Sequence, residues 1–177
     1  MNIVITILAV IAGLVVLFLL IAYFTPREFS VEKLISINKP KQQVFDYVKL
    51  LKNQEYYSVW VMKDPNIKLV YTGVDGTVGA TSSWTSDDKN VGIGEQEIKE
   101  IVNGEKMLVE IRFKKPFEAT NYATTTVTTN GDNHATVSLR FYGKSKFPMN
   151  FSNIFVPKLV GKDMDKNLHN LKTNLEK

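Results

Sequence analysis

The most constraining feature of this sequence is an apolar run near its N-terminus, from Ile3 to Phe24, that contains no charged residue. As an α-helix the run would be about 33 Å long, which matches a lipid hydrocarbon core of about 30 Å. Pro26 follows the run and would stop the helix. The run therefore predicts one membrane-spanning helix, with residues 1–25 as an anchor and residues 26–177 as a separate domain.

A cleaved signal peptide is the alternative interpretation of this run. Its length, the lack of Lys or Arg before it and the lack of an Ala-x-Ala cleavage site argue against that alternative. Positive residues instead follow the run, at Arg27, Lys33, Lys39 and Lys41. Because positive charge accumulates on the cytoplasmic side of membrane proteins, we expect a single-pass protein of the cell membrane whose larger domain lies in the cytoplasm.

The rest of the chain has the composition of a soluble domain. All 22 Lys and Arg residues and all 18 Asp and Glu residues follow residue 26, and the net charge is only +4. Basic and acidic residues are interleaved, as in residues 162–166, so we expect no nucleic-acid partner. The chain has no cysteine and only two separated histidines, His134 and His169, so we expect neither a disulfide nor a metal site. Dinucleotide and P-loop motifs are also absent, and we expect no cofactor.

The apolar pattern predicts a strand and two short helices at the start of this domain and one long helix at its end. Alternating residues predict a strand over 29–37, and Pro40 then lies where a short helix would begin. A second short helix is expected over residues 54–61. An apolar stripe at helical spacing predicts a long helix over residues 149–176.

The middle of the domain reads as a meander of antiparallel strands. Asn103-Gly104 is the strongest hairpin signal, and a further turn is expected at residues 130–132. The six expected strands cover residues 67–72, 77–85, 92–102, 106–114, 118–129 and 135–143.

This order of elements, together with several short strings, resembles the START-like helix-grip superfamily, also called SRPBCC or polyketide cyclase/dehydrase and lipid transport proteins. The resemblance covers about residues 29–176. Within the superfamily, the chain is similar to a bacterial subgroup of unassigned activity. The strings are VFDYVKLLKN (44–53), YSVW (57–60), DGTVGA (75–80), GIGEQEI (92–98) and RFKKPFEAT (112–120).

The resemblance implies an α+β fold with a seven-stranded curved antiparallel sheet around the long C-terminal helix and two small helices after the first strand. It also implies an apolar cavity between sheet and helix, where superfamily members bind lipids, sterols, quinones or polyketides. Some members catalyse cyclisation or ring opening, and others act as regulatory or interaction domains, so the fold does not choose the function.

Aromatic residues are the natural candidates to line such a cavity, because apolar pockets take their orientation from a few phenol, indole or amide groups. A plain filled core is the alternative interpretation for each of them. The candidates for the ligand-binding cavity are Tyr57, Trp60, Trp84, Gln96, Phe113, Tyr122 and Phe141.

The polar candidates have two interpretations each. Glu95 and Glu97 share one strand face and would form an acid–base pair if they faced the cavity, but we expect a solvated outer face with Gln96 inward. We likewise expect Arg112 in an outer ion pair. A basic group near the first short helix either contacts anionic lipid beside the anchor or is a solvated face; it comprises Lys39, Lys41, Lys49 and Lys52.

The sequence therefore favours a membrane-anchored domain that binds a hydrophobic small molecule, such as a lipid or quinone, with the bilayer as its other partner. Catalysis is not required, and no catalytic residue is assigned. One alternative is a cyclase- or dehydratase-like enzyme that uses polar groups near Trp84, Gln96 and Glu97. Another is a stress-related interaction domain whose interior is filled.

Overall fold

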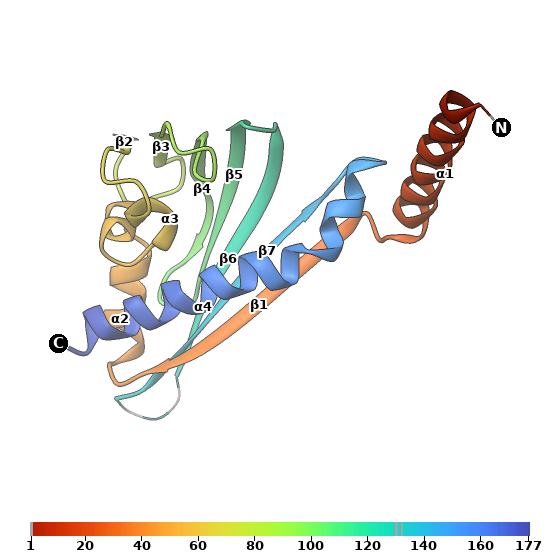
Figure 1. The fold of residues 1–177 in the computed structure, drawn as a ribbon. Coiled ribbons are helices and arrows are strands. Elements are labelled where there is room, and N and C mark those ends of the chain that lie inside the picture. Colours follow the sequence, from red (N-terminus) through yellow and green to blue (C-terminus); the bar gives the residue numbers. More distant parts are fainter. Residues whose placement is uncertain (1, 130, 132) are drawn as a thin grey trace.

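The computed structural model describes residues 2–129, 131 and 133–177, and it has the α+β architecture that the sequence predicts (Figure 1). A helix near the N-terminus precedes a curved sheet, and a long helix closes the chain. The helices are α1 (Ile3–Phe24), α2 (Lys41–Val48), η1 (Leu51–Tyr56), α3 (Val59–Met62), η2 (Met149–Ile154) and α4 (Val156–Leu175), where η denotes a 3₁₀ helix.

The seven strands form one antiparallel sheet in the order β1-β7-β6-β5-β4-β3-β2, so only β1 is out of chain order. The links between consecutive strands from β2 onward range from three residues at the turn of Gly104, whose φ of 73° suits glycine, to eight residues between β2 and β3. The other turn expected at residues 130–132 lies partly outside the described residues. The strands are β1 (Glu28–Ile37), β2 (Lys68–Thr72), β3 (Thr81–Thr85), β4 (Ile93–Val102), β5 (Lys106–Lys115), β6 (Ala119–Thr129) and β7 (Ala135–Lys144).

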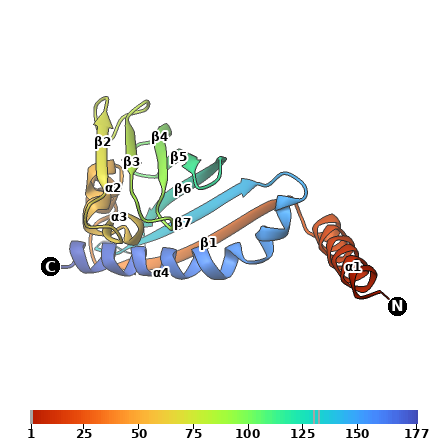
Figure 2. The same ribbon diagram turned by 45° about the horizontal axis from the view of Figure 1, so that its top comes forward.

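Helix α4 lies along β1 and packs its apolar stripe against one face of the sheet (Figures 1 and 2). Leu168 and Leu171 of this stripe are buried against Phe45 of α2 and Val137 of β7. Burying side chains of this size contributes about 1.5–3 kcal/mol each. The main core therefore sits where α2, α4 and the adjoining strands meet.

The two predicted helical regions differ from the structure in their boundaries. The helix expected over 149–176 is divided into η2 and α4, because Pro157 lacks the N–H for an α-helical bond and its ring clashes with the carbonyl four residues earlier. The helix expected over 54–61 is likewise replaced by η1 and α3. Asp75 contributes to this difference, since its carboxylate accepts the N–H groups that begin η1.

Helix α1 is the single helix in the described part of the chain that is long and apolar enough to cross a membrane. An apolar stretch of 18 residues within it contains no buried residue. It lies next to η2 and the beginning of β1, whereas α2 lies at the far end of the domain (Figure 1). The ten residues of β1 carry the chain about 33 Å from α1. The basic group near α2 is therefore not beside the anchor, where its interpretation as a lipid contact had placed it; Lys41 and Lys49 pair with Glu105 and Asp46.

Candidate functional site

The face of the sheet that turns toward α4, called the inner face below, carries several of the predicted cavity residues. Directly paired residues of an antiparallel ladder point to the same face. Trp84 is paired with Gly94, and Gly94 with Phe113, so these positions share a face. Gln96 lies on this face too, because it is two residues from the fully buried Ile98. The prediction that Gln96 points inward is confirmed.

Trp84 occupies a slot that exists because residue 94 is glycine. A Cβ atom at Gly94 would lie 2.3 Å from Cζ2 of Trp84, so any side chain there would displace the indole. Trp84 packs edge-on against Phe113 with 5.8 Å between ring centroids, and its Nε1–H donates to the carbonyl of Val91 at 3.3 Å. The β4–β5 register shifts between Ile93 and Gly94, next to this close approach of the indole.

Polar groups at the edge of the inner face come from Gln96 and from the segment around η1. Nε2 of Gln96 donates to Oε1 of Gln54 at 2.7 Å, which ties η1 to β4. Tyr57 follows η1, and its ring lies 6.3 Å from that of Tyr47. Burial, and then the neighbouring Tyr47 phenol, raise the pKa of Tyr57, so it stays a neutral hydroxyl. Asn170 of α4 donates to the carbonyl of Tyr57 at 3.1 Å and fixes its backbone.

Phe141 lies at the other end of the inner face, near α1. It is paired with the buried Val31 of β1 and packs against Phe29, with 5.7 Å between ring centroids. Trp60 lies on α3 and is partly buried. Thus Trp84 and Phe113 form one aromatic contact and Phe141 and Phe29 another, rather than one continuous cluster.

The inner face is fully buried at the main core and only partly covered elsewhere. Phe45 and Val137 of the core have no exposed surface. Trp84, Phe113 and Phe141, in contrast, are each of intermediate exposure. Aromatic rings that face the interior but keep accessible surface are able to contact a small apolar molecule, whereas a filled core would cover them.

Tyr122 is not part of this face, and its prediction as a cavity residue is wrong. It is paired with Glu110 and Tyr142 on the outer face, its hydroxyl donates to Glu110 at 3.3 Å, and its ring stacks on Tyr142 at 5.6 Å. Alternation from the buried Val127 assigns odd-numbered residues of β6 to the inner face and Tyr122 to the outer one.

The charged candidates gather on the outer face around Arg112, as the sequence predicts. Arg112 donates to Glu95 at 2.7 Å, to Glu97 at 2.9 Å, and to Glu110. Hydrogen bonds from Arg112 lower the pKa of Glu95, and hydrogen bonds from Lys99 and then Arg112 lower that of Glu97. The two carboxylates are therefore ionised and turned away from the inner face, so they do not form an acid–base pair there.

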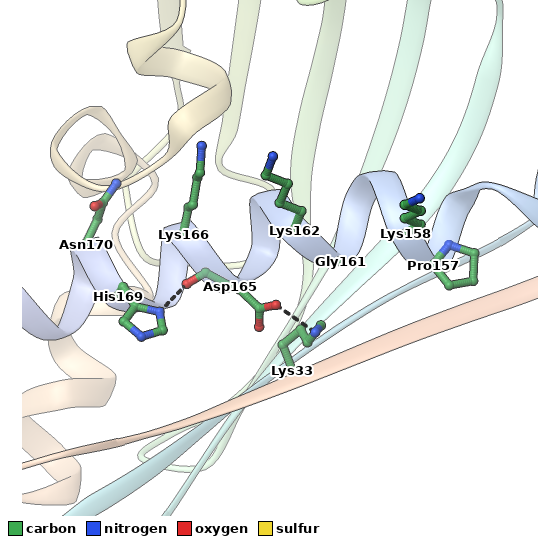
Figure 3. A pocket seen from close by; sticks show the side chains of 9 residues that line it. All are labelled: Lys33, Pro157, Lys158, Gly161, Lys162, Asp165, Lys166, His169 and Asn170. Carbon is green, nitrogen blue, oxygen red and sulfur yellow. Dashed lines mark hydrogen bonds and ion pairs between the residues drawn. The ribbon is translucent and has the colours of Figure 1, made fainter.

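A shallow groove of about 550 Å³ runs along the exposed side of α4 (Figure 3). Lys158, Lys162 and Lys166 follow one another along it at one-turn spacing, and Lys33 pairs with Asp165 at 2.7 Å. The three lysines are exposed, so the groove is a solvated basic surface. Among the described residues, no group of three or more His, Asp or Glu side chains is arranged to hold a metal ion.

Two residues at the inner face, Phe29 and Gln54, are not among the cavity candidates from the sequence. The alternation of the first strand places Phe29 on the same face as Val31, so the sequence does indicate its position. Gln54 has no such signal, because η1 is a single short 3₁₀ segment whose faces depend on what it packs against.

Comparison with solved structures supports the same fold. Norcoclaurine synthase from Thalictrum flavum, in complex with dopamine and hydroxybenzaldehyde, is similar with a TM-score of 0.63 and 11% identity over 87% of this chain and 89% of that one. Protein CV1439 from Chromobacterium violaceum has a TM-score of 0.60 and 14% identity, over 84% and 97% of the two chains. The di-domain ARO/CYC StfQ of the steffimycin biosynthetic pathway has a TM-score of 0.61 and 10% identity over 84% of this chain and 51% of that one. At these identities the likeness establishes the helix-grip fold alone.

The family is established by the sequence. No curated protein matches the chain. Residues 28–176, which span β1 to the end of α4, match the family described as polyketide cyclase / dehydrase and lipid transport. This chain therefore belongs to the polyketide cyclase/dehydrase and lipid transport family, within the SRPBCC superfamily.

Proposed function

We propose that this chain is a membrane-anchored SRPBCC domain that binds a small apolar molecule, such as a lipid or quinone, on the inner face between the sheet and α4. The observation that carries the proposal is the incomplete burial of Trp84, Phe113 and Phe141, although all three face the interior. Gln96 and Tyr57 add the few polar groups that orient a ligand in an apolar site.

The length and composition of α1 support the anchor. A molecule that dissolves in the bilayer is concentrated there, and an anchored binding face stays close to that supply. The positive residues after α1 favour a cytoplasmic domain. Reporter fusions at the C-terminus test this orientation, and activity of a periplasmic reporter alone would overturn it.

A cyclase- or dehydratase-like enzyme is the second candidate, because the solved structures similar to this chain include norcoclaurine synthase and the ARO/CYC protein StfQ. The fold supports this enzyme hypothesis, but the positions of the polar residues in this chain support it less. Glu97, the carboxylate that this hypothesis used, binds Arg112 on the outer face and does not contact the inner face. Binding without catalysis uses only groups that the inner face offers.

Native mass spectrometry of the full chain, released from detergent, tests the binding proposal. We expect a retained apolar molecule that lipid analysis then identifies. Phe113→Ser removes a ring of the inner face and should release most of this molecule, whereas Tyr122→Ser removes a ring of the outer face and should retain it. Absence of any bound molecule from the unchanged chain, or equal losses from both variants, would refute the proposal and favour an interaction domain with a filled interior.

A further inference from the structure

The end of α1 is attached to η2 by a buried side chain. The last carbonyl groups of a helix have no partner within it and must be satisfied elsewhere. Nδ2 of Asn150 donates to the carbonyl of Ala22 at 2.5 Å and to that of Thr25 at 2.8 Å. Asn150 is 1% exposed, and Ala22 is the one buried residue of α1. The amide of Asn150 therefore caps α1 from a segment that is distant in sequence.

A second asparagine fixes the residues that link α1 to β1. Nδ2 of Asn153 donates to the carbonyls of Pro26 and Arg27, both at 3.0 Å. Its Oδ1 accepts the hydroxyl of Ser145 at 2.8 Å. The link is thus held in place by η2 and does not behave as a free tether.

Aromatic contacts extend this attachment along α1. Phe18, one turn before Ala22, packs edge-on against Phe151 of η2 with 5.2 Å between ring centroids. Phe151 packs in turn against Phe155 at 5.6 Å. Polar and apolar contacts together therefore make α1, η2 and the start of α4 one packed unit.

Large apolar side chains remain exposed on this unit. Exposed apolar side chains gathered on one packed unit mark an interaction site, and exposed lysines near them in sequence match the pattern of segments that lie in the interface of an anionic bilayer. Lys146 and Lys158 are the exposed lysines nearest in sequence. The exposed apolar residues are Tyr23, Phe24, Phe147, Met149, Ile154, Phe155 and Leu159.

We propose that η2 and the first turn of α4 lie in the boundary between headgroups and acyl chains of the bilayer, held there by the cap on α1. The inference rests on the proposed membrane anchor and identifies the surface of the domain that contacts lipid. The continuity of this surface with α1 favours lipid as the occupant over a second protein. The Phe29–Phe141 end of the inner face lies next to this surface, because β1 begins at the end of α1.

Single-cysteine variants test the inference cleanly, because the chain has no cysteine of its own. A solvent-sensitive fluorophore is attached to the full chain in vesicles of phosphatidylcholine and phosphatidylglycerol that carry a lipid-bound nitroxide quencher. Leu159→Cys samples the proposed surface and Leu34→Cys, on the outer face of β1, is its matched control; the two leucines are 67% and 65% exposed. Leu14→Cys in α1, at 61% exposure, reports the anchor.

We expect lipid quenching at position 159 to be at least about 2-fold stronger than at position 34, with position 14 the most strongly quenched. Strong quenching at 14 with equal, weak quenching at 159 and 34 would overturn the inference and leave the anchor standing. Weak quenching at all three positions would refute the anchor and the inference with it. Strong quenching at 34 as well as at 159 would also overturn it, because the contact would not be specific to η2 and α4.

Discussion

Replacement of Arg112 by methionine should destabilise the domain in a pH-dependent way. Methionine keeps the apolar stem but removes the guanidinium that binds Glu95, Glu97 and Glu110. Glu97 and Glu110 are direct partners in the β4–β5 ladder, so the variant leaves two like charges opposite one another.

The expected loss follows from the exposure of these groups. The four side chains are 20–31% exposed, so solvent screens them in part. Each such ion pair contributes up to about 1 kcal/mol, and the unpaired like charges cost a few tenths more. We therefore expect a loss of about 2 kcal/mol in the free energy of unfolding at pH 7.

The pH dependence follows from the pKa values of the carboxyl groups. The pKa values of Glu95 and Glu97 are lowered in the folded protein. The contribution of these two carboxylates to the free energy of unfolding is therefore complete above the unfolded glutamate pKa of about 4.3, and it is lost as the pH falls through the folded pKa values. The difference between the variant and the unchanged chain should then shrink steadily below pH 4.

Urea unfolding of the full chain in a non-ionic detergent, followed by tryptophan fluorescence at several pH values, measures this difference. Arg140→Met is the matched control, because Arg140 lies on the same outer face and donates to the hydroxyl of Ser30. Adding Glu110→Gln to Arg112→Met should restore part of the stability by removing the like-charge pair. An equal loss at pH 7 and pH 3, or no loss at pH 7, would refute the electrostatic explanation.

Three further predictions concern packing and capping. Gly94→Ala should lower the free energy of unfolding by about 2–3 kcal/mol and shift tryptophan emission, because the added Cβ would lie 2.3 Å from Trp84. Gly13→Ala, where nothing lies within 4 Å of the added Cβ, should change neither. Asp75→Ala should lower the free energy of unfolding, measured by thermal unfolding, by about 1 kcal/mol, because alanine accepts no N–H group of η1. Asp75→Asn should lower it by less, since the amide oxygen still accepts one; equal losses would contradict this explanation. Asn150→Leu should speed tryptic cleavage in the link after α1, because two carbonyl groups lose their donor; an unchanged rate would show that the cap does not hold the link.

The fold was predictable because its signals are local. The alternation of GIGEQEI assigned Gln96 to one face and Glu95 and Glu97 to the other, and the structure agrees. The same reasoning failed in β6. Threonine is present on both faces of that strand, so polarity gives little contrast, and Tyr122 was assigned to the wrong face.

The sequence alone determined that α1 would be an apolar helix, that seven strands and a long helix would follow, and which family the chain belongs to, because length, periodicity and turn residues are read within short segments. Only the tertiary structure decided that Trp84 fills the space above Gly94, and that α2 lies far from α1. It also decided that Asn150 caps α1, a contact between residues 128 apart in sequence. The physical reason is that a polar side chain acquires a partner only when folding brings an unsatisfied group within hydrogen-bond distance, and no local pattern carries that information.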